Sequence, residues 1–84
     1  MKTVKKTIKV CYFAMFRENA GVSEEALTTD AATAGDVFEA TRDRHGSAEP
    51  LAHCKVAIND YMVSWDSEVC DGDTVLLFPP VAGG

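Results

Sequence analysis

The sequence predicts a small α+β domain in which a mixed sheet of about five strands is crossed by one main helix. Two strand-like segments precede a single long helical segment, and three more strand-like segments follow it. The 84 residues, 46% of them hydrophobic, suffice for one modest core but not for two. No repeat, linker or low-complexity segment divides the chain. A single folded unit with the last strand in its centre is therefore expected.

Five segments have the composition of strands. The first alternates around Ile8, Val10 and Tyr12, with β-branched and aromatic types prominent. The second is weaker, because Ala26 and Leu27 stand between glutamates and threonines. The expected strands span residues 4–13, 23–29, 55–58, 61–65 and 74–78.

One long helix is expected between the second and third strands. Thr33 and Asp36 have the spacing of a capping box, and Gly46 is placed to end the helix. Residues 34–45 would form it, and Phe38 would supply much of its burial. The rest of the core-facing side is expected to be Val37 and Thr41, with Ala34 and Ala40 at the edges. A shorter helix is expected over residues 14–20, ended by Gly21.

Two turns organise the second half of the chain. Asn59-Asp60 lies between two strand-like segments and predicts a two-residue hairpin turn. Asp71-Gly72-Asp73 predicts a turn that leads into the last strand.

The last strand is expected to have one buried face and one outer face. Side chains alternate along a strand, so Val75 and Leu77 share the first face, and Thr74, Leu76 and Phe78 share the second. Thr74 indicates that the second face points outward. Leu76 and Phe78 would then form an exposed apolar patch, which usually marks a protein partner. The alternative is that Phe78 only covers the sheet edge.

The final segment, FPPVAGG, predicts an extended tail over residues 79–84 beyond a folded domain of residues 1–78. Its two prolines cannot continue a sheet ladder. Six residues after Phe78 reach roughly 20 Å when extended. That length would carry the terminal carboxylate into a narrow channel on another protein. The alternative is an ordinary frayed terminus.

Composition disfavours several functions. With 13 acidic and 8 basic residues, the net charge of -5 disfavours nucleic-acid binding. Three cysteines without C-x-x-C spacing indicate neither a disulfide framework nor a zinc site, and they suit a reducing cytoplasm. No stretch approaches the ~20 apolar residues of a membrane span. A soluble, cytoplasmic protein without membrane association is expected.

Conventional catalytic motifs are also missing from the sequence. His45 and His53 have no catalytic partner at a recurring spacing, and His45 suits the negative end of a helix dipole. The acidic segment between Asp66 and Asp73 lacks the pattern of a calcium loop, so no metal site is expected. Any chemistry would belong to the carboxylate of Gly84. Adenylation would convert this poor electrophile into a mixed anhydride, and sulfur could then displace AMP to give a thiocarboxylate.

The complete ending FPPVAGG is the most specific motif in the chain. A Gly-Gly end without the preceding residues would be less specific, because it would also suit thiamine-type carriers or ubiquitin-like modifiers. Further motifs run the full length: Ile8-Lys9-Val10, Tyr12-Phe13-Ala14, Arg17-Glu18, Ala20-Gly21, Ala57-Ile58-Asn59, Val63 and Asp71-Gly72-Asp73. With these residues the chain resembles the MoaD group of ubiquitin-like sulfur carriers, the small subunits of molybdopterin synthase. It departs from that group at Ala40-Thr41, where the group tends to carry leucine.

The resemblance implies a ubiquitin-like β-grasp fold and a sulfur carrier without catalytic activity of its own. Gly84 would be adenylated by an E1-like enzyme that uses ATP, and would then be thiocarboxylated. The loaded tail would enter the large synthase subunit, which holds the catalytic pocket, and supply sulfur for the molybdopterin dithiolene. Two small and two large subunits would form a heterotetramer, and this chain would bind no cofactor. The expected partner-binding residues are Leu76, Phe78, Pro79, Pro80, Val81, Ala82 and Gly83, of which Gly83 allows passage through the channel.

Two other readings remain open. A ubiquitin-like modifier would be joined to lysines through Gly84. A plain interaction module would function without Gly83 and Gly84.

Overall fold

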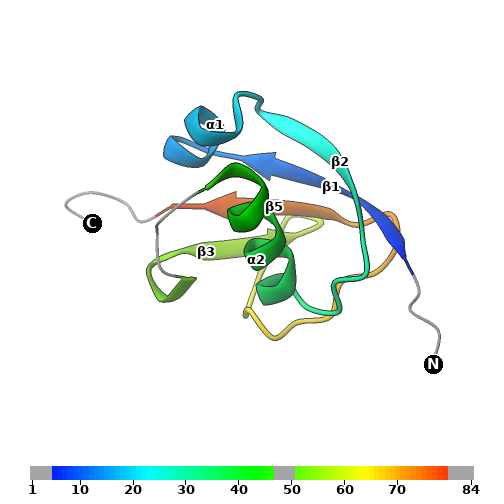
Figure 1. Cartoon of the computed structure of the whole chain (residues 1–84). Coiled ribbons are helices and arrows are strands. Elements are labelled where there is room, and N and C mark those ends of the chain that lie inside the picture. The colour runs from blue at the N-terminus through cyan, green and yellow to red at the C-terminus, as the bar shows by residue number, and fades with distance from the viewer. Residues whose placement is uncertain (1–4, 47–50, 80–84) are drawn as a thin grey trace.

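A five-stranded mixed sheet forms the centre of the molecule in the computed structural model, which describes residues 5–46 and 51–79 (Figure 1). The strand order is β2-β1-β5-β3-β4. β1 and β5 pair in parallel, and the other three pairings are antiparallel. The strands are β1 (Lys6–Tyr12), β2 (Glu24–Thr29), β3 (Lys55–Ile58), β4 (Tyr61–Val63) and β5 (Thr74–Phe78), and the helices are α1 (Met15–Ala20), α2 (Ala34–His45) and the short 3-10 helix η1 (Leu51–His53). The predicted mixed sheet, main helix and central last strand are confirmed.

Local sequence signals set both ends of α2. The Thr33 hydroxyl accepts a hydrogen bond from the backbone N–H of Asp36 at 3.2 Å, and the Asp36 carboxylate accepts one from the N–H of Thr33 at 3.3 Å. At the other end Gly46 adopts a left-handed conformation with φ 76°, and its N–H donates to the carbonyl of Arg42 at 2.7 Å. Both arrangements give partners to backbone groups that a helix end leaves unpaired. The predicted capping box and helix bounds are confirmed.

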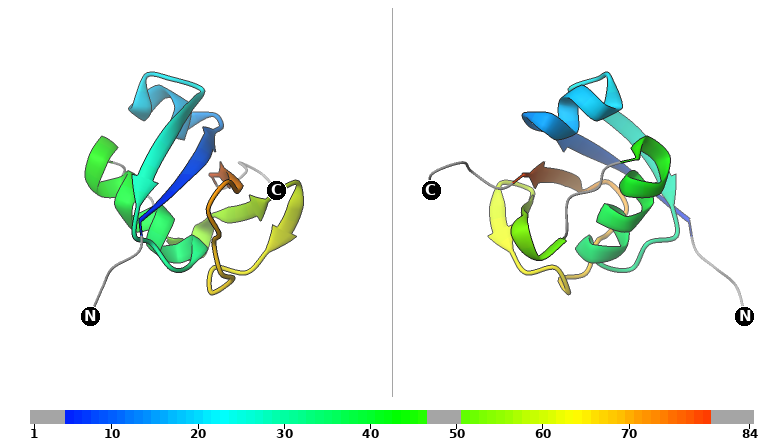
Figure 2. Two further views of the ribbon diagram at one scale, coloured as in Figure 1. Left: turned by 90° about the vertical axis from the view of Figure 1, so that its right-hand side faces the viewer. Right: turned by 60° about the vertical axis from the view of Figure 1, so that its left-hand side comes forward.

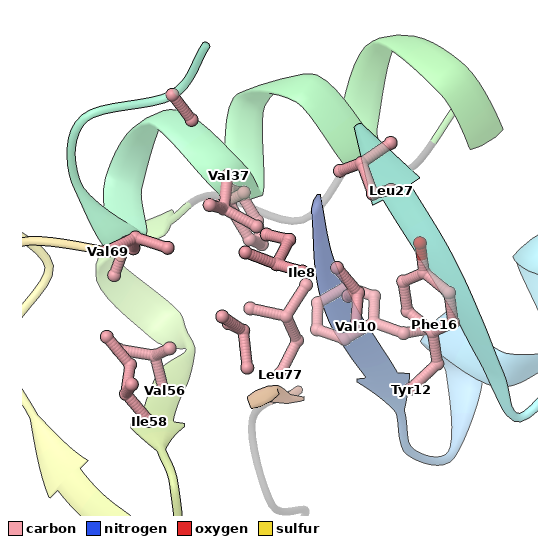
Figure 3. Close-up of a cluster of buried hydrophobic side chains, with 14 of the residues drawn as sticks. Ile8, Val10, Tyr12, Phe16, Leu27, Val37, Val56, Ile58, Val69 and Leu77 are labelled. Carbon is pink, nitrogen blue, oxygen red and sulfur yellow. The ribbon is translucent and has the colours of Figure 1, made fainter. Parts of the chain in front are cut away.

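The core lies between α2 and one face of the sheet (Figures 2 and 3). Phe38 is its largest fully buried side chain, and its ring meets those of Phe16 and Trp65 edge to face at centroid distances of 5.8 and 5.3 Å. The helix face follows the predicted pattern, since Ala34, Val37, Phe38 and Thr41 are buried and Ala40 is partly buried. The sheet contributes Ile8, Val10 and Tyr12 from β1, Val56 and Ile58 from β3, and Val75 and Leu77 from β5.

The hairpin between β3 and β4 forms as predicted but is shorter on one side. Asn59 and Asp60 have φ values of 52° and 75°, which are the left-handed conformations of a two-residue hairpin turn. β4 ends at Val63, although the sequence predicted a strand through Trp65. The chain leaves the sheet there because the Trp65 carbonyl accepts a hydrogen bond from the N–H of Gly35 at 2.7 Å. This bond draws the segment toward the start of α2.

Candidate functional site

The candidate site is the edge of the sheet at which β5 ends. Because β1 and β5 are parallel, their carboxyl ends lie at the same edge, and α1 begins there directly after β1 (Figure 1). Phe78 is the last residue of β5, and Pro79 follows it as a partly buried residue. The remaining predicted tail positions lie outside the described residues: Pro80, Val81, Ala82, Gly83 and Gly84.

The alternation predicted for β5 is confirmed. Val75 and Leu77 are fully buried against the core, whereas Leu76 and Phe78 point to the opposite face of the sheet. Both outer residues are partly buried rather than fully exposed, which corrects the expectation of an exposed patch built from them alone. Their strand is central, so neighbouring strands cover it on both sides.

An apolar row crosses the outer face of the sheet at Leu76. The strand registers place Cys11 of β1 and Ala57 of β3 on either side of Leu76, and Met62 of β4 beside Ala57. Directly opposed side chains on neighbouring strands lie in contact range. Phe78 extends this surface toward the tail. We call Cys11, Phe13, Ala57, Met62, Leu76 and Phe78 the outer patch.

Phe13 and Met62 are the most exposed side chains of the outer patch. Met62 is 62% exposed and Phe13 is 38% exposed. The Phe13 ring stacks on the Phe78 ring with a centroid distance of 4.7 Å and an interplanar angle of 16°. Neither residue was predicted from the sequence to belong to the site. For Phe13 the signal that could have found it is the alternation along the first strand, since it directly follows the buried Tyr12. Met62 has no such signal, because Tyr61 beside it is also exposed.

The backbone turns sharply where β1 gives way to α1. Ala14 has φ 52° and ψ -124°, a conformation that glycine adopts readily and alanine does not. The turn is held by hydrogen bonds from the N–H groups of Arg17 and Glu18 to the Ala14 carbonyl at 3.0 and 3.2 Å. It leaves Phe13 on the outer face, beside Phe78, while Phe16 turns into the core.

The thiol of Cys11 is held in its neutral form within the outer patch. Burial raises its pKa above the usual value, and the Glu24 carboxylate acts in the same direction. Lys9 lowers the pKa by less than these two effects raise it, and Asp60 adds the smallest increase. A neutral thiol is a poor nucleophile. Cys11 therefore acts here as an apolar contact. No disulfide joins Cys11, Cys54 and Cys70, all of which lie among the described residues.

The acidic turn before β5 has a structural role. Asp71 accepts a hydrogen bond from the N–H of Thr7 at 2.8 Å. Asp73 accepts from the side-chain amide of Asn59 at 2.9 Å and from the N–H of Cys70 at 2.8 Å. These bonds fasten the turn to β1 and to the hairpin. In residues 5–46 and 51–79, no three His, Cys, Asp or Glu side chains are grouped as metal ligands.

His45 has a partner that the sequence did not reveal. Its Nε2 lies 2.6 Å from Oε2 of Glu25, across the gap between the end of α2 and β2. The signal in the sequence is weak: Glu25 lies two positions before Leu27 and so shares its strand face, which places a charge on an inward-facing position of β2.

No helix in the described part of the chain is long and apolar enough to cross a membrane.

Relatives with known names match this chain over nearly its whole length. It is 36% identical to the molybdopterin synthase sulfur carrier subunit of Escherichia coli over 80 residues, which cover 92% of this chain and 99% of the relative. The protein of the same name from Haemophilus influenzae is 38% identical over 80 residues, with the same coverage.

Solved structures agree in fold. A putative molybdopterin converting factor subunit 1 from Pyrococcus furiosus matches with a TM-score of 0.77 and 40% identity, covering 90% of this chain and 99% of that one. The small archaeal modifier protein 1 of Haloferax volcanii also matches with a TM-score of 0.77, at 26% identity over 90% of this chain and 99% of its own. A complex of subunits 1 and 2 of the molybdopterin-converting factor from Helicobacter pylori contains a chain that matches with a TM-score of 0.60 and 26% identity, covering 93% and 99%.

The predicted ubiquitin-like β-grasp fold is thereby confirmed, since a Caldiarchaeum subterraneum ubiquitin also matches, with a TM-score of 0.64 at 20% identity. The model of the ThiS family matches residues 10–84, which include the whole of the candidate site and the residues beyond it. The chain belongs to the ThiS family.

Proposed function

We propose that this protein is the sulfur-carrier subunit of a molybdopterin synthase. The observation that carries the proposal is the near full-length similarity to subunits of that name, in a sequence whose last residues are Gly83-Gly84 and whose last strand, β5, ends at Phe78. The proposal places the chemistry on the carboxylate of Gly84. The folded domain, residues 1–78, positions the tail, residues 79–84.

The proposed reaction at the carboxylate of Gly84 has four steps. An E1-like partner transfers AMP from ATP to the carboxylate, and pyrophosphate leaves. A sulfur nucleophile then attacks the acyl carbon and displaces AMP, which gives a thiocarboxylate. In the synthase the thiocarboxylate sulfur attacks a carbon of the molybdopterin precursor, and an oxygen substituent leaves that carbon as the new C–S bond forms. Water then attacks the acyl carbon of the resulting thioester and breaks its acyl C–S bond, so that the sulfur stays on the product and Gly84 regains its carboxylate.

The carrier needs no catalytic group of its own in this scheme. The pocket for the precursor lies on the large subunit, and ATP is bound by the activating enzyme. Docking of the folded domain on the partner would raise the effective concentration of the sulfur at the partner's active site. Two carriers and two large subunits form the heterotetramer of this proposal, and the cytoplasm, its proposed compartment, supplies a reducing environment for the thiocarboxylate.

The outer patch is the proposed docking surface for the large subunit. It adjoins the point at which the tail leaves the sheet, and it combines exposed Phe13 and Met62 with the central Leu76. Apolar surface of this kind is favourable to bury against a partner. Phe78 and Pro79 continue the contact toward Pro80, Val81, Ala82 and Gly83, whose contacts stay predictions.

Leu76→Asp is expected to weaken binding to the large subunit by at least about tenfold, because a buried carboxylate at the middle of an interface lacks a partner there. Isothermal titration calorimetry of the purified subunits measures the change. Thr74→Asp is the matched control, since Thr74 lies on the same face of β5 and is also partly buried. Equal affinity for wild type and Leu76→Asp would remove Leu76 from the docking surface.

Intact mass spectrometry tests the proposed function directly. Incubation with the activating enzyme, ATP and a sulfur source should raise the mass of the chain by about 16 Da, as one oxygen is replaced by sulfur. The loaded chain should then convert the precursor to molybdopterin together with the large subunit. A chain that gains no sulfur under these conditions contradicts the proposal.

The second candidate function is a ubiquitin-like protein modifier. The match to a small archaeal modifier protein supports it, because the two chains share the fold and most of their length. A modifier would form an isopeptide bond between the Gly84 carbonyl and a lysine amine of a target. Lysine-linked conjugates without a sulfur-bearing species in the same assay would favour this function, and a thiamine-type carrier would gain sulfur without supporting molybdopterin formation.

A further inference from the structure

Four polar side chains meet at the end of α2, on the face of the sheet that the helix covers. Tyr12 comes from β1, Glu25 from β2, and Arg44 and His45 from the last turn of α2. Glu25 is paired with the fully buried Val10, so its side chain points to the same, helix-covered face. The four residues join three elements that are separate in sequence. The proposed function uses none of them.

The Glu25 carboxylate is the centre of this cluster. Its Oε2 accepts a hydrogen bond from the Tyr12 hydroxyl and lies 2.6 Å from Nε2 of His45. Its Oε1 lies 3.3 Å from Nε of Arg44. The side chains of Glu25 and His45 are each only 16% exposed. The rings of Tyr12 and His45 meet edge to face, with their centroids 5.5 Å apart. Both carboxylate oxygens therefore have donors in a largely water-excluded position.

The surroundings favour an ionised Glu25. Burial raises its pKa, but hydrogen bonds from His45 and Tyr12, together with the charges of His45 and Arg44, outweigh burial and lower the pKa below its usual value. The same contact acts on Tyr12, whose pKa is raised by burial and by the hydrogen bond to Glu25. A small pocket adjoins the cluster: Arg42 adds one more positive charge to its wall, while α1 contributes uncharged side chains there, Phe16 and Asn19.

We propose that Tyr12, Glu25, Arg44 and His45 form a pH-dependent latch, which holds the last turn of α2 against the sheet while Glu25 is ionised and releases it when Glu25 takes up a proton. The latch lies at the edge of the sheet from which the tail leaves, because Tyr12 pairs with Leu77, one residue before Phe78. Release therefore loosens the support behind the outer patch before the rest of the sheet opens. The latch does not depend on the sulfur-carrier function.

The direction of the pH dependence follows from the lowered pKa of Glu25. The stabilisation is fully present above the unfolded-state value of about 4.3 and is lost as pH falls through the lower, folded-state value. A protonated carboxyl has lost its charge and accepts weaker hydrogen bonds from the same donors. The contacts that join Arg44 and His45 of α2 to Glu25 of β2 are then weaker.

Amide hydrogen exchange of the full chain, followed by NMR, tests the latch. Protection factors of residues 42–46 report on the last turn, and those of Val10 and Val75 report on the sheet centre. Glu25→Gln should lower protection of residues 42–46 by about tenfold or more at pH 7, since hydrogen bonds to charged groups are stronger than neutral ones, and should leave Val10 and Val75 unchanged. Tyr12→Phe, which keeps the ring and removes one donor, should show a smaller loss that disappears in a Glu25→Gln background.

Glu24→Gln is the matched control, because Glu24 lies next in sequence and forms an exposed ion pair with Lys9 at 3.7 Å. It should leave all protection factors as in wild type. In wild type, the Glu25 carboxyl carbon resonance should titrate below about pH 4.3, together with the protection of residues 42–46. Unchanged protection in Glu25→Gln, titration of Glu25 above that value, or equal loss at the helix end and sheet centre would each overturn the latch.

Discussion

Deletion of Gly83 and Gly84 is expected to abolish thiocarboxylate formation entirely. The proposed electrophile is the acyl carbon of Gly84, and the shortened chain would present Ala82 in its place. A methyl side chain and a reach shorter by about 7 Å would keep the carboxylate out of the narrow channel that the proposed function places on the partner. Intact mass after activation should show no gain, and molybdopterin formation with the large subunit should fall to background.

The deletion leaves the folded domain untouched, which gives the experiment its control. β5 ends at Phe78, five positions before the first deleted residue. Circular dichroism and thermal stability should therefore stay close to those of the full chain, and binding to the large subunit through the outer patch should persist. Molybdopterin formation by the deleted chain at the normal rate would instead support a plain interaction module.

Phe38→Ala is expected to lower the free energy of unfolding by about 3–5 kcal/mol. The side chain is 1% exposed, and its ring contacts the rings of Phe16 and Trp65. Truncation to alanine therefore leaves a cavity between α2 and the sheet that the surrounding residues fill only in part. The domain is small and the apolar face of α2 is narrow, so little other buried apolar surface compensates for the loss of the Phe38 ring. Urea denaturation followed by circular dichroism measures the change.

Tyr61→Ala is the control for this substitution. It also removes an aromatic ring, but Tyr61 is 75% exposed, so the expected change is within about 0.5 kcal/mol. A loss below about 1 kcal/mol for Phe38→Ala would mean that the helix packs through another face.

The sequence predicted the elements whose signals are local. Thr33, Asp36 and Gly46 mark the ends of α2 by side-chain and backbone chemistry within a few residues, and Asn59-Asp60 tolerates the left-handed conformation of its hairpin turn. The alternation in β5 likewise separates Leu76 from Val75 without knowledge of any neighbour.

Features that depend on neighbouring strands could not be predicted in this way. The partial burial of Leu76 follows from the strands on both sides of β5, and the end of β4 before Trp65 follows from a hydrogen bond to Gly35. The cluster around Glu25 joins residues up to 33 positions apart, Tyr12 and His45, which meet only in the assembled fold. The predicted tail roles stay predictions, because they fall outside the described residues.

The parallel pairing of the first and last strands has a consequence for the synthesis of this protein. β1 can pair with β2 early in translation, but its other edge stays unpaired until β5 has left the ribosome. β5 is also the strand with which β3 pairs. Contacts between such distant segments slow folding, because the loop between them must close first. A nascent chain that stops before residue 74 has neither a closed sheet nor Leu76. An incomplete chain would thus lack Leu76 and Phe78 of the proposed docking surface, and it would not compete with complete chains for the large subunit.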